Sequence, residues 1–151
     1  MKKCLRFIFM LMSIWILNGC TQNNGYIGPI FGSWSLISIS EDGIPLKLED
    51  ETTFSFQNKI VQVMKYREPP YTGTGTTKYG NFTISDDVLT MQFQLKLPDI
   101  DNYVYMTPDW LYFPMDGKPI HFDIKKLNGS KMILTLATDK GELEYRFDKT
   151  W

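Results

Sequence analysis

The stretch DVLTMQFQLKL, residues 87–97, decides the fold class of this chain. Its apolar side chains recur at every second residue, so one face carries Leu89, Met91, Phe93, Leu95 and Leu97. The opposite face carries Val88, Thr90, Gln92, Gln94 and Lys96. A period of two places successive side chains on opposite sides of a strand. The stretch therefore predicts a β-strand with one face buried and the other in water.

The same alternation recurs from residue 31 to the C-terminal end. It is clear in GELEYRFDK at 141–149, and it predicts further strands at 33–40, 52–57, 59–67, 78–85, 119–127 and 131–138. Short runs that tolerate a positive φ angle or a tight turn separate many of them, at 41–43, 57–59, 85–87, 128–130 and 139–141. No stretch in this part keeps helical spacing for more than about a turn or two. The pattern predicts eight antiparallel strands in a meander.

A meander with one apolar face can bury that face by closing into an up-and-down barrel, which also removes the free edges of the sheet. The interior of an eight-stranded barrel can be filled by side chains or can hold one small ligand. A two-sheet β-sandwich is the alternative architecture. Two longer connections, at 66–80 and 98–119, interrupt the short turns. A short strand at 103–106 or 110–113, inside the second connection, would raise the number of strands to nine.

Residues 1–19 have the form of a signal peptide, with three basic side chains ahead of an almost wholly apolar run at 7–17. A helix of that length reaches only about 16 Å, roughly half the hydrocarbon thickness of a bilayer, which argues against a permanent membrane span. The sequence LNGC that follows, residues 17–20, resembles the lipobox of bacterial lipoproteins. The resemblance implies cleavage before Cys20 and attachment of lipid to its thiol. An ordinary secretory peptide with a coincidental cysteine is the alternative.

Processing at Cys20 would leave a membrane-anchored chain. Residues 20–30 are polar and contain glycine, which indicates a flexible tether ahead of one domain at 31–151. The other cysteine, Cys4, lies in the removed segment, so the mature chain would have no free thiol and no disulfide. The full sequence has 16 basic and 17 acidic side chains, and loss of the three basic residues in the removed segment would leave 13 against 17. The mature chain would then carry a net charge of about −4, which argues against nucleic acid as a partner. We expect a cell-envelope protein of the outer membrane.

A glycine, a serine and a tryptophan at 32–34 form a G-x-W motif at the head of the first predicted strand. Two further stretches follow this motif in order, YGNFTISDDVLTMQF at 79–93 and MILTLATDKGELEYRFDK at 132–149. Together the three resemble the lipocalins, and more closely the lipocalin-like lipoproteins of the Bacteroidetes. The resemblance implies a small up-and-down barrel that holds an apolar or amphipathic small molecule. It also implies that Trp34 plugs one end of the barrel and that a basic side chain lies across it. Arg146 is the first candidate for this partner and Lys149 is the second.

Two sets of aromatic and apolar side chains are candidates for binding. The first would line the barrel around a hydrophobic ligand, or fill the barrel without one: Trp34, Phe54, Phe56, Tyr66, Phe82, Met91 and Phe93. The second lies in the 98–119 connection near Asp99, Asp101 and Asp109, where it would suit a glycan or a protein surface: Tyr103, Tyr105, Trp110 and Tyr112. These rings could instead fold down and cap the barrel. A structural accessory of an envelope complex is a third interpretation.

Catalytic and metal chemistry has few candidate residues. His121 is the only histidine, and Asp123 shares its face of the predicted strand. One histidine and one carboxylate are too few for a zinc site. No glycine-serine elbow precedes this histidine, and no cysteine nucleophile would remain after lipidation. We therefore expect a binding protein that is not an enzyme and that uses no metal or cofactor.

Overall fold

The computed structural model describes residues 28–48, 51–66, 76–93 and 111–150, and these residues form an all-β fold. The strands are β1 (Gly32–Glu41), β2 (Ile44–Pro45), β3 (Thr52–Gln57), β4 (Ile60–Lys65), β5 (Thr76–Ser85), β6 (Val88–Phe93), β7 (Ile120–Leu127), β8 (Lys131–Ala137) and β9 (Glu142–Lys149). The eight strands expected from the alternation are all present, and their described ends differ from the prediction by only a few residues. Residue 67 and residues 94–97, at the ends of two expected strands, lie outside the described part of the chain.

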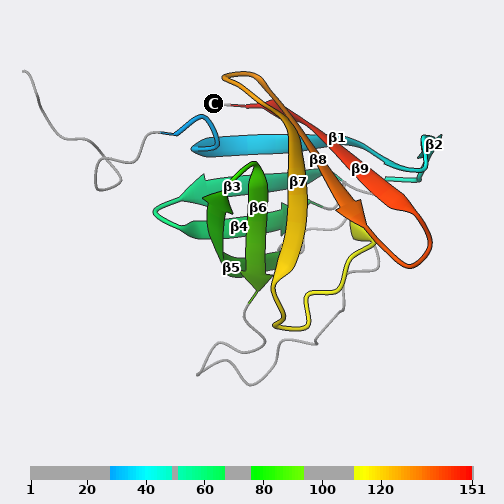
Figure 1. Cartoon of the computed structure of the whole chain (residues 1–151). Coiled ribbons are helices and arrows are strands. Elements are labelled where there is room, and N and C mark those ends of the chain that lie inside the picture. Colours follow the sequence, from blue (N-terminus) through cyan, green and yellow to red (C-terminus); the bar gives the residue numbers. More distant parts are fainter. Residues whose placement is uncertain (1–27, 49–50, 67–75, 94–110, 151) are drawn as a thin grey trace, which may run out of the picture.

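The first and last strands pair with each other and close the sheet. β1 and β9 are antiparallel, from Trp34 opposite Lys149 to Glu41 opposite Leu143. This pairing joins β1 and β3–β9 into an eight-stranded antiparallel barrel, and β2 is an extra two-residue strand beside the end of β1 (Figure 1). The predicted barrel is confirmed, and the sandwich alternative is wrong because the ladder continues around the whole sheet.

The extra strand does not lie where the sequence placed a ninth one. Residues 111–113 form a turn, while residues 103–106 and 110 lie outside the described part of the chain. The observed β2 follows directly from a reversal at Asp42 and Gly43, whose φ angles are 48° and 81°. This reversal lets Ile44 and Pro45 pair back onto the end of β1.

Polar residues with left-handed backbone conformations make two of the other hairpins. Asn58 and Lys59 turn β3 into β4, and Asp86 and Asp87 turn β5 into β6, all with φ between 48° and 64°. Two successive residues with positive φ match the right-handed twist of the strands that they join. These turns are therefore explained by the local sequence.

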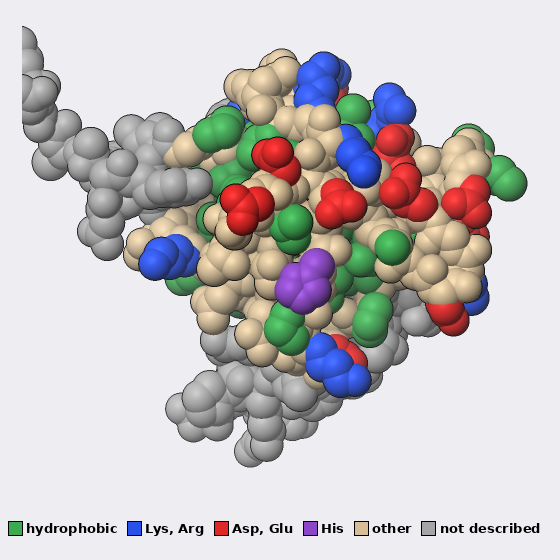
Figure 2. Space-filling model, viewed as in Figure 1, with side chains coloured by type: hydrophobic (Ala, Val, Ile, Leu, Met, Phe, Trp, Pro, Cys, Tyr) green, Lys and Arg blue, Asp and Glu red, His purple; other side chains and the backbone are tan. Residues whose placement is uncertain are grey.

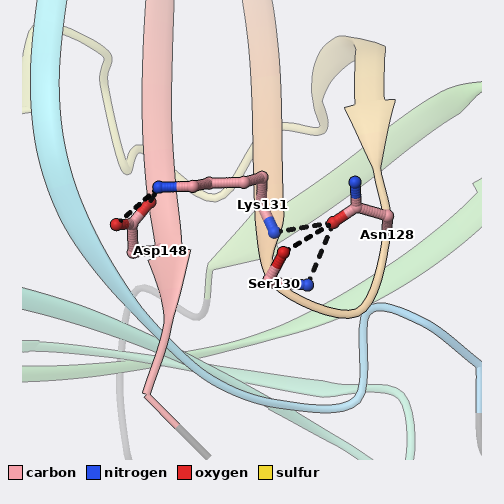
Figure 3. Close-up of polar contacts among 4 residues, drawn as sticks. All are labelled: Asn128, Ser130, Lys131 and Asp148. Carbon is pink, nitrogen blue, oxygen red and sulfur yellow. Dashed lines mark hydrogen bonds and ion pairs between the residues drawn. The ribbon is translucent and has the colours of Figure 1, made fainter.

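The hairpin between β7 and β8 is organised by a side chain. The Oδ1 atom of Asn128 accepts hydrogen bonds from the backbone nitrogens of Ser130 and Lys131, at 3.0 Å and 2.8 Å (Figure 3). The Nζ atom of Lys131 lies 2.6 Å from Oδ1 of Asp148 on β9. Both of these charged side chains are about half exposed, so the ion pair contributes little stability.

The strand order gives the barrel two different ends. At one end lie the start of β1, the end of β9 and the β3–β4, β5–β6 and β7–β8 hairpins; we call this the plugged end. At the other end lie β2, the β8–β9 hairpin and the connections that follow β4 and β6; we call this the mouth. Both long connections identified in the sequence therefore start and finish at the mouth.

A bulge in β1 changes which side chains face inward. The register with β9 shifts between Leu36 and Ser38, and Ile37 at this point is 54% exposed. Trp34 and Leu36 are buried before the bulge, and Ile39 is buried after it. Because a bulge adds one residue to a strand, it exchanges the two faces. Strict alternation, which would have placed Ser38 inward, fails here for that reason.

Candidate functional site: the barrel interior

Trp34 fills the plugged end of the barrel. Its side chain is fully buried, and its Nε1 atom donates a hydrogen bond of 2.7 Å to the backbone oxygen of Ile30. Ile30 is itself 1% exposed and forms part of the core. The sequence assigned Ile30 to the tether at 20–30, whereas the structure places this residue in the fold, where the tryptophan holds it.

Lys149 lies across the tryptophan. Its Nζ atom is 5.0 Å from the centre of the Trp34 ring and donates a hydrogen bond of 3.3 Å to the backbone oxygen of Pro29. A cation over an indole face is attracted by the electron density of the ring. Lys149 therefore binds both the plug and the chain segment that enters the barrel.

The prediction that Arg146 would be the first partner of Trp34 is wrong. Its side chain is exposed on the outside of the barrel, and its Nε atom lies 2.7 Å from Oε1 of Glu144. Tyr145 and Phe147 are buried on either side of it in the sequence, so Arg146 has the outward position of β9. Lys149 shares the parity of the buried pair and stands opposite Trp34 in the register.

Most of the side chains that were expected to line the barrel are buried. Exposure is 6% or less for Trp34, Phe54, Phe56, Phe82, Met91 and Phe93. Tyr66 is 46% exposed, so its predicted inward position is wrong. Val61 and Val63 are the inward residues of β4, and the alternation that continues from them gives position 66 an outward direction.

Rings from different strands pack against each other in the half of the barrel near the plug. The ring centres of Phe54 and Phe147 are 5.0 Å apart and meet edge to face. Phe56 and Phe82 meet in the same way at 5.1 Å. Such contacts add to the stability that apolar burial provides. These rings form a packed floor above the plug.

The mouth is occupied by a connection rather than by the barrel wall alone. In residues 111–115, which we call the cork segment, Leu111, Phe113 and Met115 are 0%, 4% and 8% exposed. The Phe113 ring lies 6.3 Å, 5.3 Å and 5.9 Å from the ring centres of three wall residues: Phe93, Phe122 and Tyr145. These three cork residues belong to neither candidate set predicted from the sequence, although the alternation of 111, 113 and 115 was a usable signal.

Tyr145 on β9 holds the cork segment by a buried hydrogen bond. Its hydroxyl donates to the backbone oxygen of Leu111 at 2.7 Å. Burial, with a smaller contribution from Tyr112, raises the pKa of the Tyr145 phenol above its ordinary value. The phenol therefore remains a hydrogen-bond donor at all physiological pH values.

Two lysines stand on the inner face of the barrel near the mouth. Lys65 lies opposite the buried Thr52, and Lys78 lies opposite the buried Val63. Directly opposed residues on neighbouring strands share one face of a sheet, so both lysines have inward positions. Each is partly buried, and each interacts with other groups of the protein. The inner surface at the mouth thus combines apolar rings with two lysine side chains.

The predicted surface-binding set can be placed only at Tyr112. This side chain is 39% exposed, and its hydroxyl donates a hydrogen bond of 3.0 Å to the backbone oxygen of Lys47. Tyr103, Tyr105 and Trp110, the three nearby aspartates and Cys20 lie outside the described residues. Tyr112 links the cork segment to the connection after β2.

His121 lies on the outer surface of β7, where Figure 2 shows it between scattered apolar side chains. Its Nδ1 atom is 3.0 Å from Oγ1 of Thr90 on β6. Among the described residues there is no cluster of three or more side chains suited to a metal ion. Within the described ranges, no helix is long and apolar enough to cross a membrane.

Comparison with known proteins agrees with this geometry. A family model described as a lipocalin-like domain matches residues 14–149. A lipocalin-like protein from Bacteroides uniformis has a similar structure, with a TM-score of 0.58 and 20% sequence identity over 81% of this chain and 99% of the other. A protein from Bacteroides eggerthii aligns with a TM-score of 0.59 and 18% identity over 79% and 98% of the two chains. No curated protein matches the chain. On the family match, this chain belongs to the lipocalin-like domain family.

Proposed function

We propose that this protein is a lipid-anchored protein of the cell envelope whose barrel binds a hydrophobic or amphipathic small molecule without chemical conversion. The observation that carries the proposal is the construction of the mouth. Its centre is filled by the cork segment, a connection, while the surrounding wall is a closed ladder of strands. A ligand can replace a connection without breaking the ladder.

The attachments of the cork are few and specific among the described residues. Two wall residues donate side-chain hydrogen bonds to this connection: Tyr145 to the oxygen of Leu111, and Gln92 to the oxygen of Gly117 at 2.8 Å. Tyr112 of the cork itself donates to the oxygen of Lys47. Displacing Phe113 would lose about 1.5 to 3 kcal/mol of apolar burial. An apolar ligand that buries a comparable area against Phe93 and Phe122 would offset this loss.

The inward lysines favour an amphipathic ligand. Lys65 and Lys78 stand where the polar end of a molecule would lie if its apolar end entered the mouth. A carboxylate there would gain favourable electrostatic interactions with both ammonium groups in a partly buried setting. We therefore propose a ligand with an apolar tail and an acidic head, of which a long-chain fatty acid is the simplest representative.

Displacement of cis-parinaric acid, a fluorescent fatty acid, tests the site. Palmitate should compete with the probe, and Phe113→Ala should strengthen binding because it empties part of the mouth. The pair Lys65→Gln and Lys78→Gln should weaken palmitate about tenfold while leaving hexadecanol unchanged. Ile37→Ala, on the outer surface, is the control. Absence of probe binding to both the wild type and the Phe113→Ala variant would refute a ligand in the barrel.

The anchor is tested separately. The match of the family model begins at residue 14, so the matched region includes Cys20. Metabolic labelling with an alkyne fatty acid should mark the wild type, and density-gradient fractionation should place it in the outer membrane. Cys20→Ser should abolish both results. Unlabelled wild-type protein in the soluble fraction would refute the anchor and leave the barrel proposal intact.

A further inference from the structure

On the outer face of the barrel, β1, β3 and β4 run side by side (Figure 1). A groove lies over these strands. This groove has a volume of about 490 Å³ and is lined by Ser33, Ser35, Glu51, Thr53, Ser55, Gln62, Met64, Tyr66 and Thr150. Its volume lies within the range typical of small-molecule sites. The lining side chains of β3 and β4 alternate with buried ones, so the groove is separated from the barrel interior by the sheet itself.

The floor of the groove is made of small hydroxyl side chains. Ser33 and Ser55 are opposed across β1 and β3, and their Oγ atoms are 2.8 Å apart. The backbone oxygen of Ser33 accepts hydrogen bonds from the backbone nitrogen and Oγ1 of Thr150, which extends the floor past β9. Short side chains between longer neighbours produce a hollow on a surface that would otherwise be convex.

The rim supplies groups of a different kind. Tyr66 presents a ring that is 46% exposed, and Met64 adds apolar surface next to it. Gln62 lies opposite Tyr79 on β5 and donates a hydrogen bond of 3.1 Å to its hydroxyl, which orients the amide. Glu51 contributes a carboxylate, and the described lining includes no basic side chain.

We propose that this groove binds a neutral oligosaccharide. A sugar ring has an apolar face that stacks on an aromatic ring, and hydroxyls that exchange hydrogen bonds with hydroxyl, amide and carboxylate groups. Tyr66 supplies the stacking surface, while Gln62, Glu51 and the serine floor supply donors and acceptors. The carboxylate, unaccompanied by a cation in the described lining, disfavours phosphorylated, sulfated and other anionic ligands. The site is distinct from the barrel interior and from the 98–119 connection.

Calorimetric titration with maltohexaose, cellohexaose, xylohexaose and mannohexaose tests the groove, with a sulfated chondroitin oligosaccharide as the anionic comparison. At least one neutral hexasaccharide should bind, and the sulfated one should not. Tyr66→Ala should weaken binding about tenfold through loss of stacking. Ile44→Ala is the control, because Ile44 is an exposed side chain on β2 outside the lining of the groove. Gln62→Leu should also weaken binding, and all variants should keep the wild-type melting temperature to within a few degrees.

The sugar-site proposal is supported if binding of a neutral sugar falls with Tyr66→Ala and with Gln62→Leu but not with Ile44→Ala. It is overturned if no neutral sugar binds at millimolar concentration, if the sulfated sugar binds as well, if Tyr66→Ala or Gln62→Leu leaves binding unchanged, or if Ile44→Ala weakens binding as much as they do. Saturating palmitate should leave sugar affinity unchanged, and Tyr66→Ala should leave cis-parinaric acid binding unchanged, so failure of the groove and failure of the barrel ligand can be told apart.

Discussion

Single residues at the two ends of the barrel perform different tasks. At the plugged end, Trp34 is fully buried and Lys149 bridges its ring to the backbone of Pro29. At the mouth, the Tyr145 hydroxyl binds the backbone of Leu111. Both contacts join a strand to a segment outside the ladder, so each residue controls how an end of the barrel is covered.

Removing the charge of Lys149 should loosen the plug. Lys149→Met keeps most of the apolar stem, so the expected loss of stability is about 0.5 to 1 kcal/mol from the cation–ring contact. The matched change Arg146→Met removes an exposed pair with Glu144 and should cost less than about 0.5 kcal/mol. Urea unfolding followed by tryptophan fluorescence measures both. Equal effects of the two changes would contradict the assigned role of Lys149.

Tyr145→Phe should destabilise the protein by about 1 to 2 kcal/mol at neutral pH, because the oxygen of Leu111 loses this donor. The raised pKa of Tyr145 means that above pH of about 10 the folded state retains a proton that the unfolded state loses. The contribution of the protonated Tyr145 hydroxyl to the free energy of unfolding is therefore complete below pH of about 10 and declines as the pH rises further. The stability gap between the wild type and Tyr145→Phe, measured in urea from pH 7 to 11, should therefore narrow above pH 10. A gap that widens there would contradict the burial of a neutral phenol.

Among the elements, the β5–β6 pair depends on the absence of a side chain. Gly80 lies opposite Phe93, and a Cβ atom at position 80 would come within 2.5 Å of the backbone oxygen of Gln92 and 3.0 Å of the Phe93 ring. The ring thus occupies the space over the glycine. The cork segment packs on the same ring through Phe113, so the geometry of β5 and β6 also sets the shape of the mouth.

Gly80→Ala should destabilise the fold by about 1 to 3 kcal/mol, since the atom that the new methyl group would meet first is backbone and cannot move away cheaply. Gly129→Ala in the β7–β8 hairpin is the control, because no atom lies within 4 Å of its built Cβ position. Thermal melts by circular dichroism compare the two. Comparable melting temperatures for the two variants would show that β5 and β6 are not so closely apposed.

At the scale of the whole molecule, closure is the main organising feature. β1 has strand partners on both sides, β3 and β9, and one connected core contains residues from the plug to the cork. Closure leaves β2 as the short strand outside the ring. A closed ladder removes edges that could pair with other chains, and it makes each strand dependent on the rest.

A proline in β1 should therefore disrupt the entire fold. Ser35 pairs with Thr53 on β3 and Asp148 on β9, so Ser35→Pro introduces a residue that cannot donate a ladder hydrogen bond in a strand with neighbours on both sides. We expect a loss of about 3 kcal/mol or more, seen as loss of the cooperative melt in circular dichroism. Ser35→Ala keeps the backbone donor and should melt close to the wild type. A normal melt for Ser35→Pro would argue against closure between β1 and β9.

The amino-acid sequence by itself determined the strands, most of their turns and most of the inward residues. These features depend on local rules: alternation along a strand, and positive φ at residues such as Asn58 and Asp86. The same alternation indicates that Lys65 and Lys78 face inward, although neither predicted binding set includes these two residues. The exported, anchored state at Cys20 is a prediction of the same kind, based on a local motif.

Only the tertiary structure decided the features that depend on how distant segments meet. The register between β1 and β9 placed Lys149, rather than Arg146, at Trp34. The bulge at Ile37 exchanged the faces of β1, and packing drew residues 111–115 into the mouth. The physical reason is the same in each case: alternation specifies which face a side chain takes, but the partner it meets there depends on the stagger of strands around a closed barrel.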